Sequence, residues 1–124
     1  MKAWIGAVAL AGMLASGGAV ADGNSFLENC QDAIKAMDED NTEIANAMGV
    51  GHCFGMVDGV MNTLLVVNEA LPPTARICFP KDGISNKQAT RIVTKYLRDN
   101  PAELHKPAAF LVISAYKQAF PCSK

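Results

Sequence analysis

The chain has 124 residues, of which 50% are hydrophobic and 19% charged, and its formal net charge is −1 at pH 7. This length suits one small domain with a single core. No basic patch stands out along the sequence, which argues against a nucleic-acid partner.

The first 21 residues have the pattern of a secretory signal peptide. Lys2 supplies a positive start, Ile5 to Leu14 form a short apolar run, and Ala19-Val20-Ala21 offers the small residues that signal peptidase needs. We expect cleavage after Ala21, so that 1–21 is the signal peptide and 22–124 the exported domain. The apolar run is too short for an anchor and Asp22, not cysteine, follows it, so neither a membrane anchor nor a lipid is expected. The mature chain then carries ten basic and twelve acidic side chains, and its expected location is the periplasm.

The first helix of the mature chain is predicted from Ser25 to Met37, with Asn24 or Ser25 as its cap. Its expected buried stripe is Leu27, Cys30, Ile34 and Met37. An acidic run follows at Asp38, Glu39, Asp40 and Glu43, which predicts a solvated turn, with a contact surface for a basic partner as the alternative.

The longest helical pattern runs from Ile44 to Leu71 and ends before Pro72-Pro73, because two prolines cannot continue it. Its apolar residues fill about half of the helical wheel, as in a helix buried among others. They are Val50, Cys53, Phe54, Met56, Val57, Val60, Met61, Leu64, Leu65, Val67 and Leu71.

The opposite side of this central helix carries a line of small and polar residues: Gly51, Gly55, Asp58, Asn62 and Glu69, with Gly59 beside them. A glycine inside a helix costs about 1 kcal/mol relative to alanine. The three glycines therefore predict close backbone approach, either as an internal helix contact or as a surface for self-association. Asp58 either faces water or a partner, or meets a Lys or Arg, and its place on the glycine line favours the first reading.

The rest of the chain predicts a loop and two more helices. The loop, Pro72 to Ile84, is long enough to expect that Cys78 and Pro80 hold it in place. Helix three begins at Ser85 with a capping box to Gln88. Its stripe is Ala89, Ile92, Val93, Tyr96 and Leu97. Helix four begins at Asn100-Pro101-Ala102-Glu103, and Pro107 must kink or restart it. Its stripe is Leu104, Ala108, Leu111, Val112, Ala115 and Ala119.

The four cysteines, Cys30, Cys53, Cys78 and Cys122, predict two disulfides, because their number is even and the domain is small and exported. Their wide spacing argues against zinc. Three pairings are open from the sequence. If the first two helices form an antiparallel hairpin, Cys30 and Cys53 lie at similar distances from its turn, which favours Cys30 with Cys53 and Cys78 with Cys122. The expected fold is therefore an all-α, four-helix domain around a central glycine-containing helix, stapled by two disulfides.

No motif for catalysis is evident, since the sequence lacks GxSxG, HExxH and a phosphate-binding loop. An enzyme built on a cysteine and a histidine would need a free thiol, which thiol titration would reveal. We therefore expect no enzymatic activity, no cofactor and no metal. His52 is predicted at the edge of the buried face, and His105 is predicted to be exposed or capping.

Several segments together resemble a known family. They are Cys53-x-Gly55-x-Val57-x-Gly59-Val60, Cys78-Phe79-Pro80, the stretch YLRDNPAELHKPAA from Tyr96 to Ala109, and Ala119-Phe120-Pro121-Cys122. This order resembles the Rap/Tai family of periplasmic immunity proteins, over nearly the whole mature chain. The most specific parts are NPAELHKPAA and the closing FPC. The sequence departs from the family at Met56-Val57, where an aromatic and aliphatic pair is common.

The resemblance implies an all-helical protein, often a dimer, that blocks the catalytic cleft of a peptidoglycan amidase delivered by type VI secretion. We expect the inhibitory surface on a connecting loop, either Pro72 to Ile84 or Arg98 to Lys106. The candidate contact residues on these loops are Lys81, Asp82, Asp99, Glu103 and His105. The alternative is an orphan periplasmic binding or envelope-stress module with the same fold and no toxin. A small exported hydrolase in the neighbouring reading frame would favour immunity.

Overall fold

The computed structural model describes residues 22–39 and 43–123. The expected signal peptide and Asp40 lie outside the described residues. Within them the chain forms four α-helices, α2 (Gly23–Asp38), α3 (Ala47–Val67), α4 (Asn86–Asp99) and α5 (Ala108–Ala119), with short 3-10 turns between α3 and α4 and between α4 and α5. The described part holds no strand, only an isolated bridge between Asp22 and Pro107. The predicted all-α, four-helix architecture is confirmed.

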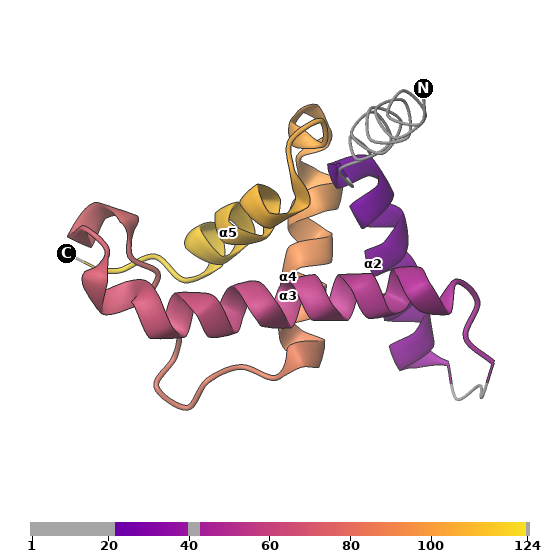
Figure 1. Ribbon diagram of the computed structural model, residues 1–124, viewed down its shortest axis with the longest axis horizontal. Helices are drawn as coiled ribbons and strands as arrows, with labels where there is room; N and C mark the ends of the chain where they lie inside the picture. The colour runs from indigo at the N-terminus through magenta and orange to yellow at the C-terminus, as the bar shows by residue number, and fades with distance from the viewer. Residues whose placement is uncertain (1–21, 40–42, 124) are drawn as a thin grey trace, which may run out of the picture.

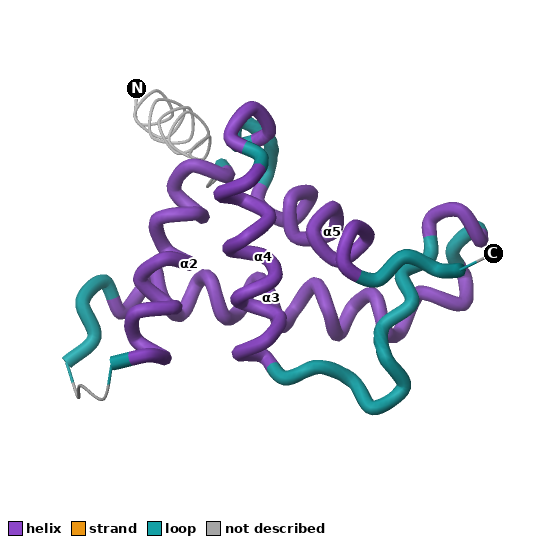
Figure 2. The backbone as a smooth tube through the Cα atoms, turned by 180° about the vertical axis from the view of Figure 1, so that it is seen from behind, coloured by secondary structure: helices purple, strands orange, loops and turns teal. Residues whose placement is uncertain are grey.

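Helix α3 is the long element that the other helices share. It crosses α2, α4 and α5, and α4 also packs between α2 and α5 (Figures 1 and 2). The core lies where these helices meet, and its largest fully buried side chains are Tyr116, Phe26, Ile77, Leu97 and Leu111.

The start of α2 differs from the prediction. Asp22, not Asn24 or Ser25, caps the helix, because its Oδ1 accepts hydrogen bonds from the backbone N–H groups of Asn24 (3.0 Å) and Ser25 (3.2 Å). The helix therefore begins two residues earlier than Ser25. Phe26, Cys30 and Ala33 are buried. Leu27 is partly buried and packs against the core, whereas the predicted stripe was wrong at Ile34 and Met37, which are partly buried and lie outside the core cluster.

Helix α3 begins at Ala47 because Asn46 caps it from a left-handed conformation (φ 57°). The Asn46 side chain accepts from the backbone N–H of Gly49 (3.2 Å) and donates through Nδ2 to Asn29 Oδ1 (3.1 Å) and Asp32 Oδ2 (3.0 Å). A Cβ on Gly49 would lie 2.2 Å from Asn29 Oδ1 and from Asn46 Nδ2. This polar cluster therefore requires glycine at position 49, a position that the sequence did not single out.

The outer side of α3 is more open than predicted. Leu65 and Val67, expected to be buried, are 57% and 37% exposed, because the last turn of the helix extends past its neighbours. Gly51, Gly55 and Gly59 have no atom within 4 Å of an added Cβ. The internal helix contact predicted for the glycine line was therefore wrong, whereas the self-association reading is untouched by this observation.

Helices α4 and α5 follow the predicted signals with one break. The Ser85 side chain accepts from the backbone N–H of Gln88 (3.0 Å) and so caps α4. Pro107 restarts the helical pattern: Pro101–Glu103 forms only a 3-10 turn, and α5 begins at Ala108. Two expectations on the buried faces differ. Ala119 is exposed, and Thr90 and Thr94 are buried, their hydroxyls donating to the backbone one turn earlier.

Both disulfides form with the predicted pairing. Cys30 and Cys53 join α2 to α3, and Cys78 and Cys122 join the loop after α3 to the C-terminal segment. The first bridge is 0% exposed at both cysteines. The second lies near the surface, where Cys78 is exposed and Cys122 is half-buried.

Tyr116 was absent from the predicted stripe of the last helix, yet it is one of the largest fully buried side chains. Its hydroxyl donates to the backbone carbonyl of Val57 in α3 (2.8 Å). Burial, with a smaller contribution from the negative charge of Asp58, raises the pKa of Tyr116 well above its ordinary value.

We expect Tyr116→Phe to lower the free energy of unfolding by about 1 kcal/mol at neutral pH, because the Val57 carbonyl loses this donor. Above pH 10.0, the ordinary pKa, the unfolded state releases the tyrosine proton while the folded state keeps it. The contribution of Tyr116 to the free energy of unfolding is therefore fully present below that pH. Above it this contribution falls by up to about 1.4 kcal/mol per pH unit. Urea unfolding between neutral and alkaline pH tests this, and an equal alkaline slope in wild type and Tyr116→Phe would contradict it.

By length and composition the helical stretch 47–70 could cross a membrane, and it is the one such stretch in the described ranges. One such helix is weak evidence, because a core helix passes the same test. Here the stretch is tied to α2 by the Cys30–Cys53 disulfide and to α5 by the Tyr116 hydrogen bond.

Candidate functional site

The loop between α3 and α4 is anchored along its first half. The backbone of Ile77 both donates to and accepts from the Asn68 side chain (3.0 Å each). Next to it, the backbone N–H of Cys78 donates to the Phe120 carbonyl (3.0 Å), and the disulfide to Cys122 adds a covalent link. Phe79 packs edge-on against Tyr116 with ring centroids 5.2 Å apart. The expectation that Cys78 holds this loop is confirmed.

Beyond these anchors the loop projects away from the helices (Figures 1 and 2). Its tip is a turn in which the backbone N–H of Gly83 donates to the Pro80 carbonyl (2.8 Å). Gly83 has φ 74°, which glycine adopts without strain. Lys81 and Asp82 are exposed at this tip, and neither has a side-chain hydrogen bond or ion pair in the described part of the chain. The tip thus offers one cation and one anion on a fixed base.

The second predicted loop, Arg98 to Lys106, is a compact corner. Leu104 is buried, and its carbonyl accepts from Asn24 Nδ2 (3.3 Å), while the Lys106 carbonyl accepts from the backbone N–H of Gly23 (3.1 Å). Glu103 pairs with Lys106. Most of this segment therefore packs against the start of α2 and holds it in place.

The predicted contact residues do not form one site. Lys81 and Asp82 lie at the tip of the projecting loop, and Asp99, Glu103 and His105 lie at or near the compact corner, where Asp99 pairs with Lys95 and His105 is exposed. The contact candidates of the central helix lie on the outer side of α3; they are Gly51, Gly55, Asp58, Gly59 and Asn62. These are three separate surfaces.

Two polar residues of α3 occupy the places that were predicted for them. Asp58 is partly exposed and makes no ion pair with any described Lys or Arg. His52 lies at the edge of the buried face, where its Nδ1 is 3.4 Å from Asn29 Nδ2 and its ring meets Phe26 edge-on.

The acidic run after α2 is partly neutralised. Asp38 forms an exposed ion pair with Arg91 of α4 (2.7 Å). The hydrogen bond from Arg91 holds the pKa of Asp38 below its ordinary value. This pair ties the end of α2 to α4, so Asp38 serves the fold.

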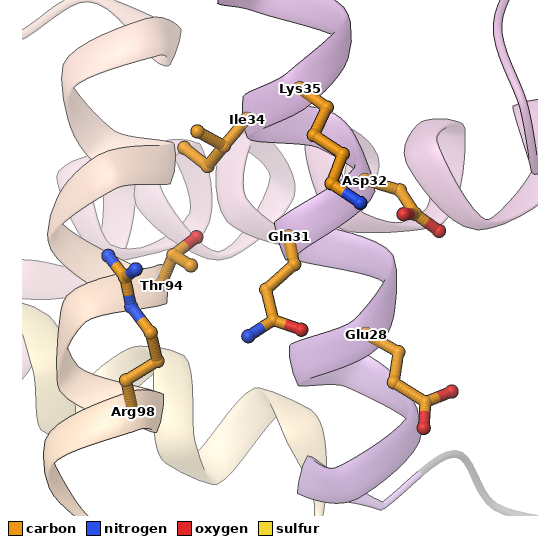
Figure 3. Close-up of a pocket in the computed structure, with 7 residues that line it drawn as sticks. All are labelled: Glu28, Gln31, Asp32, Ile34, Lys35, Thr94 and Arg98. Atoms are coloured by element: carbon orange, nitrogen blue, oxygen red, sulfur yellow. The ribbon is translucent and has the colours of Figure 1, made fainter.

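A polar groove of about 590 Å³ between α2 and α4 was missed by sequence reasoning (Figure 3). Gln31 and Arg98 point into it from opposite walls, and Thr94 lines its floor. Glu28 and Asp32 lie on the far side of α2 in the same view. The wall residues are spaced as ordinary solvent-facing positions of two helices, so no sequence signal separates them from other surface residues.

The described residues contain no cluster of three or more His, Cys, Asp or Glu side chains that could hold a metal ion. All four cysteines are in disulfides, so the free thiol that a cysteine-based enzyme needs is missing. The two bridges are consistent with an oxidising compartment outside the cytoplasm. The described fold is that of a small helical protein with two disulfides and no free thiol.

A family model for the Rap1a immunity proteins matches residues 22–122. The chain therefore belongs to the Rap1a immunity protein family. Immunity proteins are inhibitors and not enzymes, and membership implies immunity against a type VI secretion effector. No curated protein and no solved structure matches the chain.

Proposed function

We propose that this protein is a periplasmic immunity protein that binds a peptidoglycan amidase effector of type VI secretion and blocks its catalytic cleft. The observation that carries the proposal is the family match over residues 22–122. The amidase target follows from the resemblance in the sequence, and the periplasmic location follows from the signal-peptide pattern in 1–21 and the two disulfides.

The blocking element is the loop from Pro72 to Ile84, with Lys81 and Asp82 at its tip. Its geometry supports this assignment, because the tip projects while its base is fixed by Asn68 and the Cys78–Cys122 bridge. A prearranged loop loses little conformational entropy when it enters a cleft. The corner from Arg98 to Lys106 is less suited, since its backbone is used to seat α2.

The test uses the oxidised mature protein, 22–124, with the exported hydrolase encoded in the neighbouring reading frame. We expect one equivalent of the protein to abolish amide hydrolysis of peptidoglycan. The double variant Lys81→Glu/Asp82→Lys is expected to weaken inhibition at least about tenfold, because it reverses both charges at the tip. Glu103→Ala/His105→Ala on the compact corner is the matched control and should inhibit as wild type does.

Two outcomes would overturn parts of this proposal. If the corner variant loses inhibition and the tip variant keeps it, the blocking element is the corner. If the neighbouring hydrolase is absent or is neither bound nor inhibited, the amidase target is wrong and the orphan periplasmic module becomes the better description.

The family resemblance also implies a dimer. We propose that the mature protein self-associates.

A further inference from the structure

The groove between α2 and α4 is a surface that the proposed function leaves unused. Its volume of about 590 Å³ is within the roughly 300 to 1,000 Å³ of small-molecule sites. On α4 its wall comes from the second half of the helix, at Thr94 and Arg98, whereas the projecting loop enters α4 at its first turn. A ligand bound in this groove would therefore not need the loop that is proposed to block the effector.

Two arginines of α4 face α2, and they lie seven residues, or about two helical turns, apart. The first, Arg91, pairs with Asp38 of α2 (2.7 Å). The two helices run in opposite directions (Figure 1), so the position that faces the second arginine lies seven residues earlier in α2. That position is Gln31, which lines the groove opposite Arg98 (Figure 3). The helix pair thus repeats one contact, with an amide where the first contact has a carboxylate.

The charge of Arg98 has no counter-ion among the described residues. Arg98 forms none of their ion pairs and none of their side-chain hydrogen bonds. Asp99, its neighbour in the chain, pairs with Lys95. Glu28 and Asp32 lie on the far side of α2 (Figure 3), and Asp32 is hydrogen-bonded to the residue that caps α3 (3.0 Å). An anion that enters the groove would therefore meet an uncompensated guanidinium.

The donors in the groove match a single negative charge. A guanidinium presents a fork of N–H donors, which binds a carboxylate through two parallel hydrogen bonds. The Gln31 amide adds N–H donors from the opposite wall. Lys35, the other cation of the lining, extends along α2 toward Asp32 and away from Arg98 (Figure 3). One cation and one amide therefore face the groove, which fits a carboxylate better than a doubly charged phosphate.

The rest of the lining indicates what carries the carboxylate. Gln31 offers a carbonyl acceptor as well as N–H donors, the two groups that pair with a peptide bond. Ile34 adds an apolar contact beside it. The Thr94 hydroxyl provides no free donor, because it already donates to the Thr90 carbonyl (2.7 Å). We infer that this groove binds a short peptide through a free carboxylate, which Arg98 and Gln31 hold.

The test measures binding to the oxidised mature protein, 22–124, by following its backbone amide signals in NMR titrations. The probes are the tripeptide Ala-Ala-Glu, which carries two carboxylates, its neutral counterpart Ala-Ala-Gln amide, and inorganic phosphate. The acidic peptide should shift the signals of α2 and α4 at the groove. It should bind at least about tenfold more tightly than the neutral peptide, because hydrogen bonds between ionised groups are the stronger ones.

Two variants test whether Arg98 holds the carboxylate. Arg98→Gln removes the guanidinium and should weaken binding of the acidic peptide at least about tenfold. Gln31→Glu should weaken it as well, because a built-in carboxylate would then occupy Arg98 as Asp38 occupies Arg91. Lys87→Gln is the matched control. It removes one positive charge from the same helix at an exposed position outside the groove, so the affinity should change less than about threefold.

The inference goes beyond effector inhibition, so Arg98→Gln should still inhibit the effector as wild type does. Equal affinity for the two peptides, or no binding of either, would overturn the inference. Phosphate that binds more tightly than the acidic peptide, and is lost in Arg98→Gln, would assign the groove to a phosphate ligand instead. If Arg98→Gln weakens effector binding and leaves peptide binding unchanged, the groove belongs to the effector interface and the peptide site is wrong.

Discussion

Replacing Cys30 and Cys53 together with alanine is expected to lower the free energy of unfolding of the mature protein by about 3 to 5 kcal/mol. The bridge spans a sequence separation of 23, which in the chain-entropy model contributes about 3 kcal/mol. Both cysteines are 0% exposed, so the lost sulfur atoms also leave space in the core. Since a small domain has only about 5 to 15 kcal/mol in total, this variant should lie close to unfolding. Urea denaturation followed by circular dichroism measures the loss.

The second bridge is compared through the double variant Cys78→Ala with Cys122→Ala. Its longer separation of 44 gives about 4 kcal/mol in the same model, but its cysteines lie near the surface, so little core space is lost. We expect both double variants to be strongly destabilised, and the surface one to lose inhibition as well because its loop is released. A loss below about 1 kcal/mol for the Cys30 and Cys53 pair would contradict the assigned role of the buried bridge.

Gly23→Ala is expected to lower the free energy of unfolding by about 2 to 3 kcal/mol. An added Cβ would lie 2.4 Å from Leu111 Cδ1, 2.7 Å from the Leu104 carbonyl oxygen and 2.8 Å from Leu104 Cα. The leucine tip can move, but the Leu104 backbone cannot without shifting the corner before α5. The same shift would disturb the 3.1 Å hydrogen bond from the backbone N–H of Gly23 to the Lys106 carbonyl.

Gly55→Ala makes the same chemical change in the open part of α3 and should have the opposite sign. No atom lies within 4 Å of its added Cβ, so alanine should raise the free energy of unfolding by about 0.5 to 1 kcal/mol through its better helix propensity. Thermal or urea unfolding of dilute protein measures both variants against wild type. If both variants changed the free energy of unfolding in the same direction, the close contacts of Gly23 would not explain the effect of Gly23→Ala.

These glycines illustrate what the sequence can and cannot predict. Three glycines at helical spacing predicted close backbone approach, yet within one chain no atom lies near an added Cβ at Gly51, Gly55 or Gly59. The glycines with close contacts, Gly23 and Gly49, stand alone in the sequence. Their neighbours come from segments distant in the chain, such as Leu104 and Asn29, and no local pattern reports such contacts.

Three local signals in the sequence predicted their structures correctly. Ser85 caps α4, Pro107 restarts the last helix, and the hairpin argument gave the pairing of Cys30 with Cys53. One miss was local, because the Asp22 side chain caps α2 two residues before the predicted start. The exposure of Leu65 has a tertiary cause, since it depends on how far α3 extends past its neighbours.

The candidate sites also differ in whether the sequence predicts them. The projecting loop could be predicted because its prolines, its length and Cys78 are visible in the sequence. The groove between α2 and α4 could not, because Gln31 and Arg98 become neighbours only after the helices pack. Tyr116 was missed for a related reason, since its partner is a backbone carbonyl of another helix.

One disulfide is buried in the core and the other lies near the surface, so the two differ in how easily they are reduced. A reductant meets the exposed Cys78 with its half-buried partner Cys122 long before it reaches Cys30 and Cys53 inside the core. Newly made chains in a reducing compartment would lack both bridges, so the loop would be tethered only after the thiols are oxidised. If the proposed function holds, oxidation after export would complete the loop that binds the effector.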